Sequence, residues 1–191
     1  MPAAAATASG PGRRAGLDPD EVVAAALALV EAGGPEALTM RKLAAELGVG
    51  TTTIYWHVGS REELIAAVVR RRSEQQAATP IRGATPIDRI ASVATHIMRG
   101  ALDHPQVTTL AYQVGALSEL EQPLEEALAA EIAAAGLRGR AAADALRAIL
   151  LTVAGFIVVG LEDPATAKAD ARLFDRTIRA VIADRLPEEA P

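Results

Sequence analysis

Two short helical segments lie between residues 39 and 64, and the tight turn between them restricts the fold more than any other feature of the sequence. The first segment, which Thr39 can cap, places its apolar side chains at helical spacing and stops at Gly48. Two residues later the segment Thr51–His57 begins, and a further helix follows at Ser60, with a glutamate placed for a capping box. Two short helices joined by such a turn are typical of a helix-turn-helix unit.

The rest of the chain also carries helical patterns. Asp18 and Pro19 favour the start of a helix, and the pair Gly33 and Gly34 favours its end. The 191 residues are 50% hydrophobic, which suffices for one sizeable core or for a small domain fused to a larger one. The sequence therefore predicts an all-α fold, with an N-terminal three-helix helix-turn-helix domain followed by a C-terminal helical domain.

A break in the helical pattern separates these two parts. Residues 75–86 contain two prolines and a glycine, which favours a boundary there or in the preceding helix, whose exposed end we expect at Arg70–Arg72. We predict a tail at residues 1–16, a first domain at 17–76 and a second at 77–187. Within the second domain the pattern predicts helices over residues 86–102, 105–117, 123–136, 140–161 and 163–187.

Composition limits where the protein can reside. Residues 1–16 are rich in Ala, Gly and Pro, which predicts a disordered tail. They do not form a secretory signal, in which a charged segment precedes an apolar one, because Arg13 and Arg14 come last. The alternative is a basic arm that contacts DNA phosphates through these two arginines. The longest apolar run, Ile149–Leu161, is shorter than the roughly 20 residues that span a bilayer, and predicts a buried core helix. We expect a cytoplasmic protein with no membrane partner. The absence of cysteine excludes disulfides and thiolate metal sites.

The second helix of the helix-turn-helix unit has the chemistry of a DNA reader. The whole chain has a formal charge of −5, so any binding to nucleic acid needs a local basic patch. The recognition helix of such a unit points its first residues at the major groove, and here these are three threonines, which can contact bases or phosphates. Tyr55 and His57 can contact phosphate oxygens, while Arg41, Lys42 and Arg61 supply positive charge opposed by one acid, Glu46.

Each of these residues also has a simpler interpretation. The threonines could form an exposed, poorly helical turn in which Thr51 caps the helix. A tryptophan is more often a packing anchor than a base contact, so Trp56 could lie in the core. His57, Arg41 and Lys42 could be ordinary surface residues. The joint pattern favours DNA binding more strongly than any single residue does.

The stretch "LTMRKLAAELGVGTTTIYWHVGSREELIAAV" resembles the DNA-binding domain of the TetR family of transcriptional regulators over about residues 18–70. The resemblance implies an all-α homodimer that binds an inverted-repeat operator in double-stranded DNA, usually as a repressor released by a small molecule. By matching positions, it implies base reading by the three threonines and phosphate contacts by Arg41, Tyr55, His57 and Arg61. The predicted DNA-binding residues are Thr39, Arg41, Lys42, Thr51, Thr52, Thr53, Tyr55, Trp56, His57 and Arg61.

The motifs "YWHV" and "GLED" are similar to the tetracycline-repressor branch of that family, which holds a metal–drug chelate through histidines. The counterpart of one of those ligands lies near Thr108, where no histidine stands. His96 and His104 are too few to form a coordination site. We therefore predict neither a metal nor another cofactor.

The second domain is predicted to hold an unidentified small-molecule effector between its helices. Residues of the types found there are more often core or surface than ligand contacts. The helix at 140–161 and the apolar face of Leu173, Phe174, Ile178, Val181 and Ile182 could form a four-helix dimer interface. The candidate ligand-binding residues are Thr95, Met98, Thr108, Thr109, Tyr112, Gln113, Thr152 and Phe156.

Other functions stay open at this point. A ligand-binding or sequestration protein, or an enzyme, could use the same helical core, although the sequence has no catalytic cysteine, Gly-x-Ser-x-Gly elbow or phosphate-binding loop. An architectural DNA binder would predict a strongly basic chain. If the chain is an allosteric regulator, we expect the segment at residues 74–86, which joins the domains, to carry the coupling.

Overall fold

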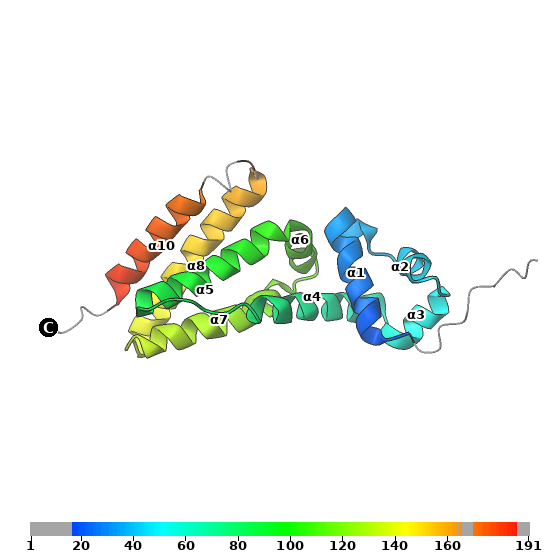
Figure 1. Cartoon of the computed structure of the whole chain (residues 1–191), viewed down its shortest axis with the longest axis horizontal. Helices are drawn as coiled ribbons and strands as arrows, with labels where there is room; N and C mark the ends of the chain where they lie inside the picture. Colours follow the sequence, from blue (N-terminus) through cyan, green and yellow to red (C-terminus); the bar gives the residue numbers. More distant parts are fainter. Residues whose placement is uncertain (1–16, 164, 166–169, 187–191) are drawn as a thin grey trace, which may run out of the picture.

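The computed structural model describes residues 17–163, 165 and 170–186, and every regular element in this part of the chain is helical (Figure 1). This confirms the predicted all-α fold. The predicted tail at residues 1–16, with Arg13 and Arg14, lies outside the described residues. The helices are α1 (Pro19–Gly33), α2 (Met40–Leu47), α3 (Thr51–Val58), α4 (Arg61–Ala77), α5 (Pro86–Asp103), α6 (Pro105–Gln113), α7 (Leu117–Ala134), α8 (Gly139–Glu162) and α10 (Ala171–Arg185), with a 3₁₀ turn η1 at Pro35–Ala37.

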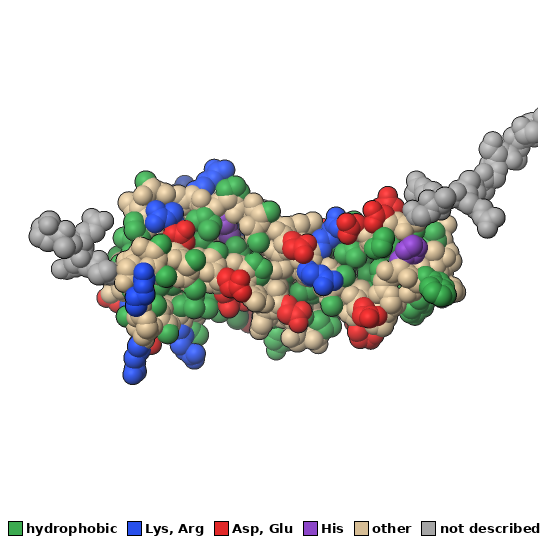
Figure 2. Space-filling model, turned by 90° about the horizontal axis from the view of Figure 1, so that it is seen from below, with side chains coloured by type: hydrophobic (Ala, Val, Ile, Leu, Met, Phe, Trp, Pro, Cys, Tyr) green, Lys and Arg blue, Asp and Glu red, His purple; other side chains and the backbone are tan. Residues whose placement is uncertain are grey.

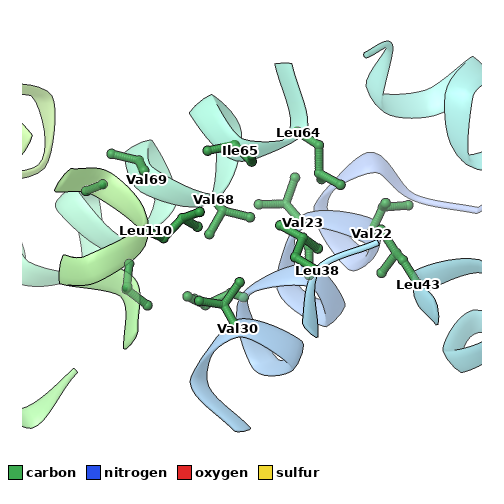
Figure 3. Close-up of a cluster of buried hydrophobic side chains, with 14 of the residues drawn as sticks. Val22, Val23, Val30, Leu38, Leu43, Leu64, Ile65, Val68, Val69 and Leu110 are labelled. Atoms are coloured by element: carbon green, nitrogen blue, oxygen red, sulfur yellow. The ribbon is translucent and has the colours of Figure 1, made fainter. Parts of the chain in front are cut away.

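The first four helices enclose one hydrophobic core. Fully buried side chains from α1, α2 and α4, such as Val22, Leu43 and Leu64, meet at its centre (Figure 3). Leu110 of α6 joins the same cluster, so α6 packs against the N-terminal helices although it follows α5 in sequence. The core thus fixes α2 and α3 on a rigid support.

A second core lies between α5, α7, α8 and α10. Ile90, Leu128, Ile149 and Ile178 are among its fully buried residues. Phe156 of α8 and Phe174 of α10 pack edge to face, with ring centroids 5.1 Å apart. In Figure 1, α10 and α8 lie beside α5 at the end of the molecule away from α3.

Helix α4 connects the two cores. It does not end at Arg70–Arg72 as predicted but continues to Ala77. The arginines do not form an exposed end, because Arg72 is partly buried. Burial lowers the pKa of its guanidinium, and the negative charges of Glu31 and Asp103 raise the pKa by a smaller amount. The next turn, with Ser73 and Gln76, is buried against the C-terminal helices. The exact boundary between the domains stays a prediction.

Three predicted helix boundaries in the second half are wrong. The helix expected to start at Pro123 begins at Leu117 and contains the proline. Helix α6 stops at Gln113, because Gly115 adopts a left-handed conformation that turns the chain into α7. The last helix, expected from residue 163, begins at Ala171, while residues 164 and 166–169 lie outside the described part.

Helix α8 agrees with its predicted range of 140–161 but differs from its prediction in burial. Within the described residues it is the one helix whose length and composition would allow it to cross a membrane. It is not a buried core helix, because only 17% of its most apolar window is buried. Large apolar side chains lie on its outer surface, namely Leu151, Val158, Val159 and Leu161.

Candidate nucleic-acid interface

Helix α2 is fixed at both ends by local hydrogen bonds. The side chain of Thr39 accepts a hydrogen bond from the backbone N–H of Lys42 at 3.2 Å, as expected of an N-cap. At the other end Gly48 is left-handed, with φ of 65°, and lets the N–H of Val49 reach the carbonyl of Ala44 at 3.0 Å. The turn into α3 is therefore short and defined, as a helix-turn-helix unit requires.

Helix α3 is held between two glycines. Gly50 is its N-cap and no side chain caps it, so the suggestion that Thr51 caps this helix is wrong. After the helix, Gly59 has φ of 71°, and a Cβ atom there would lie 2.0 Å from Oε2 of Glu63. That same carboxylate oxygen accepts a hydrogen bond from the N–H of Ser60 at 2.6 Å in the capping box of α4. Only glycine fits this junction, which sets the direction of α3.

The outer face of α3 presents hydroxyl and aromatic groups to solvent. Ile54 points inward and is fully buried, as predicted, whereas Thr52 is exposed. Tyr55 is 49% exposed and Trp56 is 85% exposed. The interpretation of Trp56 as a packing anchor is therefore wrong, and its indole is free to contact another molecule.

Positive charge flanks this face. Arg41, Lys42 and Arg61 are exposed, and in the part of the chain that the structure describes none of them forms an ion pair. Unpaired guanidinium and ammonium groups beside exposed hydroxyls can bind phosphate oxygens without first breaking an internal contact.

His57 lies to the side of the exposed face. It lines a hollow between α1, α4 and the end of α3, together with Asp20, Glu63 and Arg70. In this region Nη1 of Arg71 donates to the carbonyl of Asp20 at 3.4 Å, which ties α4 to the start of α1. Thr51 and Thr53 are partly exposed, while Thr39 is exposed at the start of α2. The structure thus brings most of the predicted DNA-binding residues to one end of the molecule, with His57 at its edge.

Known proteins share this arrangement. A family model described as bacterial regulatory proteins, tetR family, matches residues 22–68, which run from α1 into α4 and include the whole helix-turn-helix unit. The chain therefore contains a domain of the tetR family at residues 22–68.

Similarity to tetR-family proteins extends beyond the matched domain. The HTH-type transcriptional repressor Rv1353c of Mycobacterium tuberculosis is 28% identical over 77% of this chain and 59% of its own length. The transcriptional regulator SCO7222, a TetR from Streptomyces coelicolor, superposes with a TM-score of 0.73 at 20% identity over 89% of this chain and 98% of that one. BioQ with its natural double-stranded DNA operator gives a TM-score of 0.64 at 26% identity, over 86% and 99% of the two chains. The chain spans about half the length of the first curated relatives it matches.

The predicted ligand-binding residues do not meet in one cavity of the described structure. Three hydroxyls already donate to backbone carbonyls. Thr108 donates to Ala101, at the end of α5, and to His104, while Thr109 and Thr152 each donate to a carbonyl four residues earlier. Tyr112 is 75% exposed, and Gln113 is exposed beside it. Phe156 packs on Phe174 in the core.

Thr95 and Met98 do line a hollow, of about 630 Å³, between α5 and the first turns of α10. Its other lining residues include three arginines, Arg99, Arg172 and Arg176, which the sequence analysis did not consider. The hydroxyl of Thr95 already bonds to the carbonyl of Ala91 at 2.7 Å.

A third hollow, of about 570 Å³, lies between α5, α7 and α8 and is not predicted from the sequence. Ile97, Leu150 and Ile157 contribute apolar walls, while Glu121 and Glu125 contribute carboxylates. Burial raises the pKa of Glu121, and the neighbouring charge of Glu125 raises it further. The sequence signal for this site is the spacing of these two glutamates, four residues apart in an Ala- and Leu-rich helix, which places them on the same side of that helix.

Within the described ranges, no group of three His, Asp or Glu side chains is arranged to hold a metal ion. His104 instead bonds to Glu31 through Nδ1 at 2.8 Å, joining the end of α5 to α1. His96 lies apart on α5, where burial lowers the pKa of its imidazole and nearby Arg99 lowers it further.

Proposed function

We propose that the protein is a sequence-specific DNA-binding transcriptional regulator that acts in the cytoplasm as a homodimer. The observation that carries the proposal is the outer face of α3, where Thr52, Tyr55 and Trp56 are exposed beside the unpaired Arg41 and Lys42. Exposed hydroxyl and aromatic groups along the outer face of this short helix suit base edges, and cations at its border suit phosphates.

Relatives support this proposal. BioQ, of similar fold, forms a complex with its double-stranded DNA operator, and the Mycobacterium tuberculosis relative is a transcriptional repressor. On the face of the molecule shown in Figure 2, acidic and basic side chains lie side by side without a continuous band of one charge. That pattern supports a local DNA interface over non-specific binding along the whole molecule.

The homodimer would form through the outer face of α8. Only one residue of the predicted apolar face of the last helix, Leu173, is well exposed, because Phe174, Ile178 and Ile182 already pack inside the protomer. Leu151, Val158 and Val159 of α8 remain at the surface, and a second copy of the same helix would cover them in a self-complementary contact. Two recognition helices held in this way would read an inverted repeat.

The ligand that releases the operator would bind between α5, α7 and α8. The hollow there has apolar walls and a small number of carboxylates, which is the usual composition of a site for a small organic molecule. Occupation that favours one separation of the recognition helices would change operator affinity, as repression with ligand-controlled release requires. A sequestration protein or enzyme on the same core is the alternative, and the comparisons do not favour it.

Selection of DNA from a random duplex pool, at near-physiological salt, tests the proposal. We expect recovery of a palindromic site of about 15–20 base pairs, with half-sites about one helical turn apart or slightly more. The double variant Tyr55→Ala/Trp56→Ala should select nothing, whereas Tyr112→Ala, which removes an exposed tyrosine from α6, should select the wild-type site. Failure of the folded wild-type protein to enrich any sequence would reject the proposal.

A further inference from the structure

Helix α7 contains a proline where a regular helix needs a donor. Pro123 is the seventh residue of α7 and has no backbone N–H. The carbonyl of Glu119, four residues earlier, therefore lacks the hydrogen bond that it would receive inside a regular helix. A helix carbonyl that loses its intrahelical partner must be satisfied by water or by another donor.

The missing donor comes from the other domain. The hydroxyl of Ser73, on α4, donates to the carbonyl of Glu119 at 3.2 Å. Ser73 is only 4% exposed, so its hydroxyl is largely shielded from water. The break in the hydrogen bonding of α7 is thus satisfied by the helix that leaves the DNA-binding domain.

A second contact holds α4 one turn further on. Gln76 is 7% exposed and lies directly over Gly100 of α5, where an added Cβ would come within 1.4 Å of its Nε2 atom. The end of α4 is therefore seated between α5 and α7 by two buried polar side chains, which are more specific in position than an apolar contact.

Helix α7 reaches the hollow with its opposite side. Glu121 follows Glu119 by two residues, and Glu125 follows Pro123 by two residues. A separation of two residues places a side chain about 200° further around the helix. Both glutamates line the hollow between α5, α7 and α8. One helix thus contacts α4 on one side and the proposed ligand site on the other.

We propose that the bond from Ser73 to the Glu119 carbonyl, made available by Pro123, is the positioning contact that fixes the DNA-binding domain relative to α7. Displacement of α7 by a molecule in the hollow would then turn α4 and the helix-turn-helix unit with it. The signalling role rests on the proposed function, whereas the contact and its effect on domain position do not.

A double-mutant cycle tests the contact. Ser73→Ala should lower Tm by about 2–4 °C, the shift expected for one net hydrogen bond in a chain of this size. Pro123→Ala restores an N–H donor to the Glu119 carbonyl, so Ser73→Ala should then have little effect on Tm. Ser118→Ala, an exposed serine on α7, is the matched control and should be neutral in both backgrounds. Equal effects of Ser73→Ala with and without Pro123 would overturn the assignment.

Spin labels test the positioning role without DNA. The chain has no cysteine of its own, so Glu46→Cys on α2 and Ala134→Cys at the end of α7 give one labelled pair per protomer on exposed sites, and dilution with unlabelled protein isolates that pair in a homodimer. Ser73→Ala should broaden the distance distribution between the labels, and Ser118→Ala should leave it narrow. An unchanged distribution in Ser73→Ala would overturn the proposal, whereas failure to select DNA from a random pool would overturn only the regulatory function.

Discussion

The surfaces that cover the two helical cores expose different kinds of large hydrophobic side chain. The N-terminal core buries nearly all its large aliphatic side chains, and the large residues exposed on α3 are Tyr55 and Trp56. The C-terminal core leaves Leu151, Val158 and Val159 exposed along α8. Aromatic rings with polar atoms suit the wet, charged surface of DNA, whereas aliphatic side chains suit a protein surface. The contrast assigns a different kind of partner to each end of the molecule.

Truncation of the N-terminal core should give the largest loss of stability. Leu64 is fully buried beside Val22 and Leu43, so Leu64→Ala should cost about 2–5 kcal/mol in the free energy of unfolding. Urea denaturation measures the loss. Val114→Ala, at a residue 46% exposed, should stay within about 0.5 kcal/mol of the wild type. Equal costs at the two positions would contradict the description of this core.

A charge on the outer face of α8 should break association rather than folding. Leu151 is 63% exposed in the protomer, so Leu151→Asp should leave the unfolding of the protomer nearly unchanged. Each dimer would lose two buried leucines, which predicts a rise of about 100-fold in the dimer Kd. Sedimentation across a concentration series measures it. A variant that associates like the wild type would remove α8 from the interface.

Two substitutions on α3 should separate phosphate from base contacts. Tyr55→Phe removes one hydroxyl and should weaken binding to all sequences alike, by about threefold to tenfold. Thr53→Ala should instead change the preference among operators. Parallel binding titrations on a panel of duplexes distinguish the two results. If neither variant changes binding, α3 is not the recognition helix.

The smallest effect is expected at the start of α5. Nη1 of Arg179 donates to Asp88 at 2.7 Å, and with the hydrogen bonds from Thr85 it lowers the pKa of Asp88 from 3.8 to about 2. Because the ionised form is favoured in the folded state, its stabilisation is present above pH 3.8 and is lost as the pH falls through about 2.

Thermal unfolding of Asp88→Asn across pH checks this linkage. The variant should have a slightly lower Tm than the wild type at pH 7, and the two Tm values should converge towards pH 2. Asp184→Asn, which removes an exposed carboxylate paired with the adjacent Arg185, serves as the control and should show no difference. A Tm difference for Asp88→Asn that stays constant down to pH 2 would contradict the assignment.

The N-terminal domain was readable from sequence because its signals are local. Thr39, Gly48 and the capping box of Ser60 mark helix ends through contacts within a few residues, and the structure confirms each of them. The exposure of Trp56 was not readable, because it depends on which side of α3 the core occupies rather than on the residue type.

The C-terminal domain was less predictable because its decisive contacts are distant in sequence. The sequence predicts a helix start at Pro123, because the donor that makes an interior proline tolerable is Ser73, which lies 46 residues before Glu119, whose carbonyl it bonds. The hollow beside Glu121 is formed where α5, α7 and α8 pack together, and no local sequence pattern predicts which helices pack against one another. Composition and periodicity predict the helices. They do not predict that the other helices leave one face of α8 uncovered.

Because α3 is positioned by Gly50 and Gly59 at its ends, different residues determine the stability of the fold and the specificity of DNA binding. The geometry of the helix is set at its ends and by the buried Ile54, while Thr52, Tyr55 and Trp56 contribute little to the core. Descendants of this chain could therefore exchange the outward side chains and acquire new target sequences without passing through unfolded intermediates. The two glycines offer no such freedom. Related regulators that recognise different target sequences should therefore differ in the outward side chains of α3 and keep the glycines at its ends.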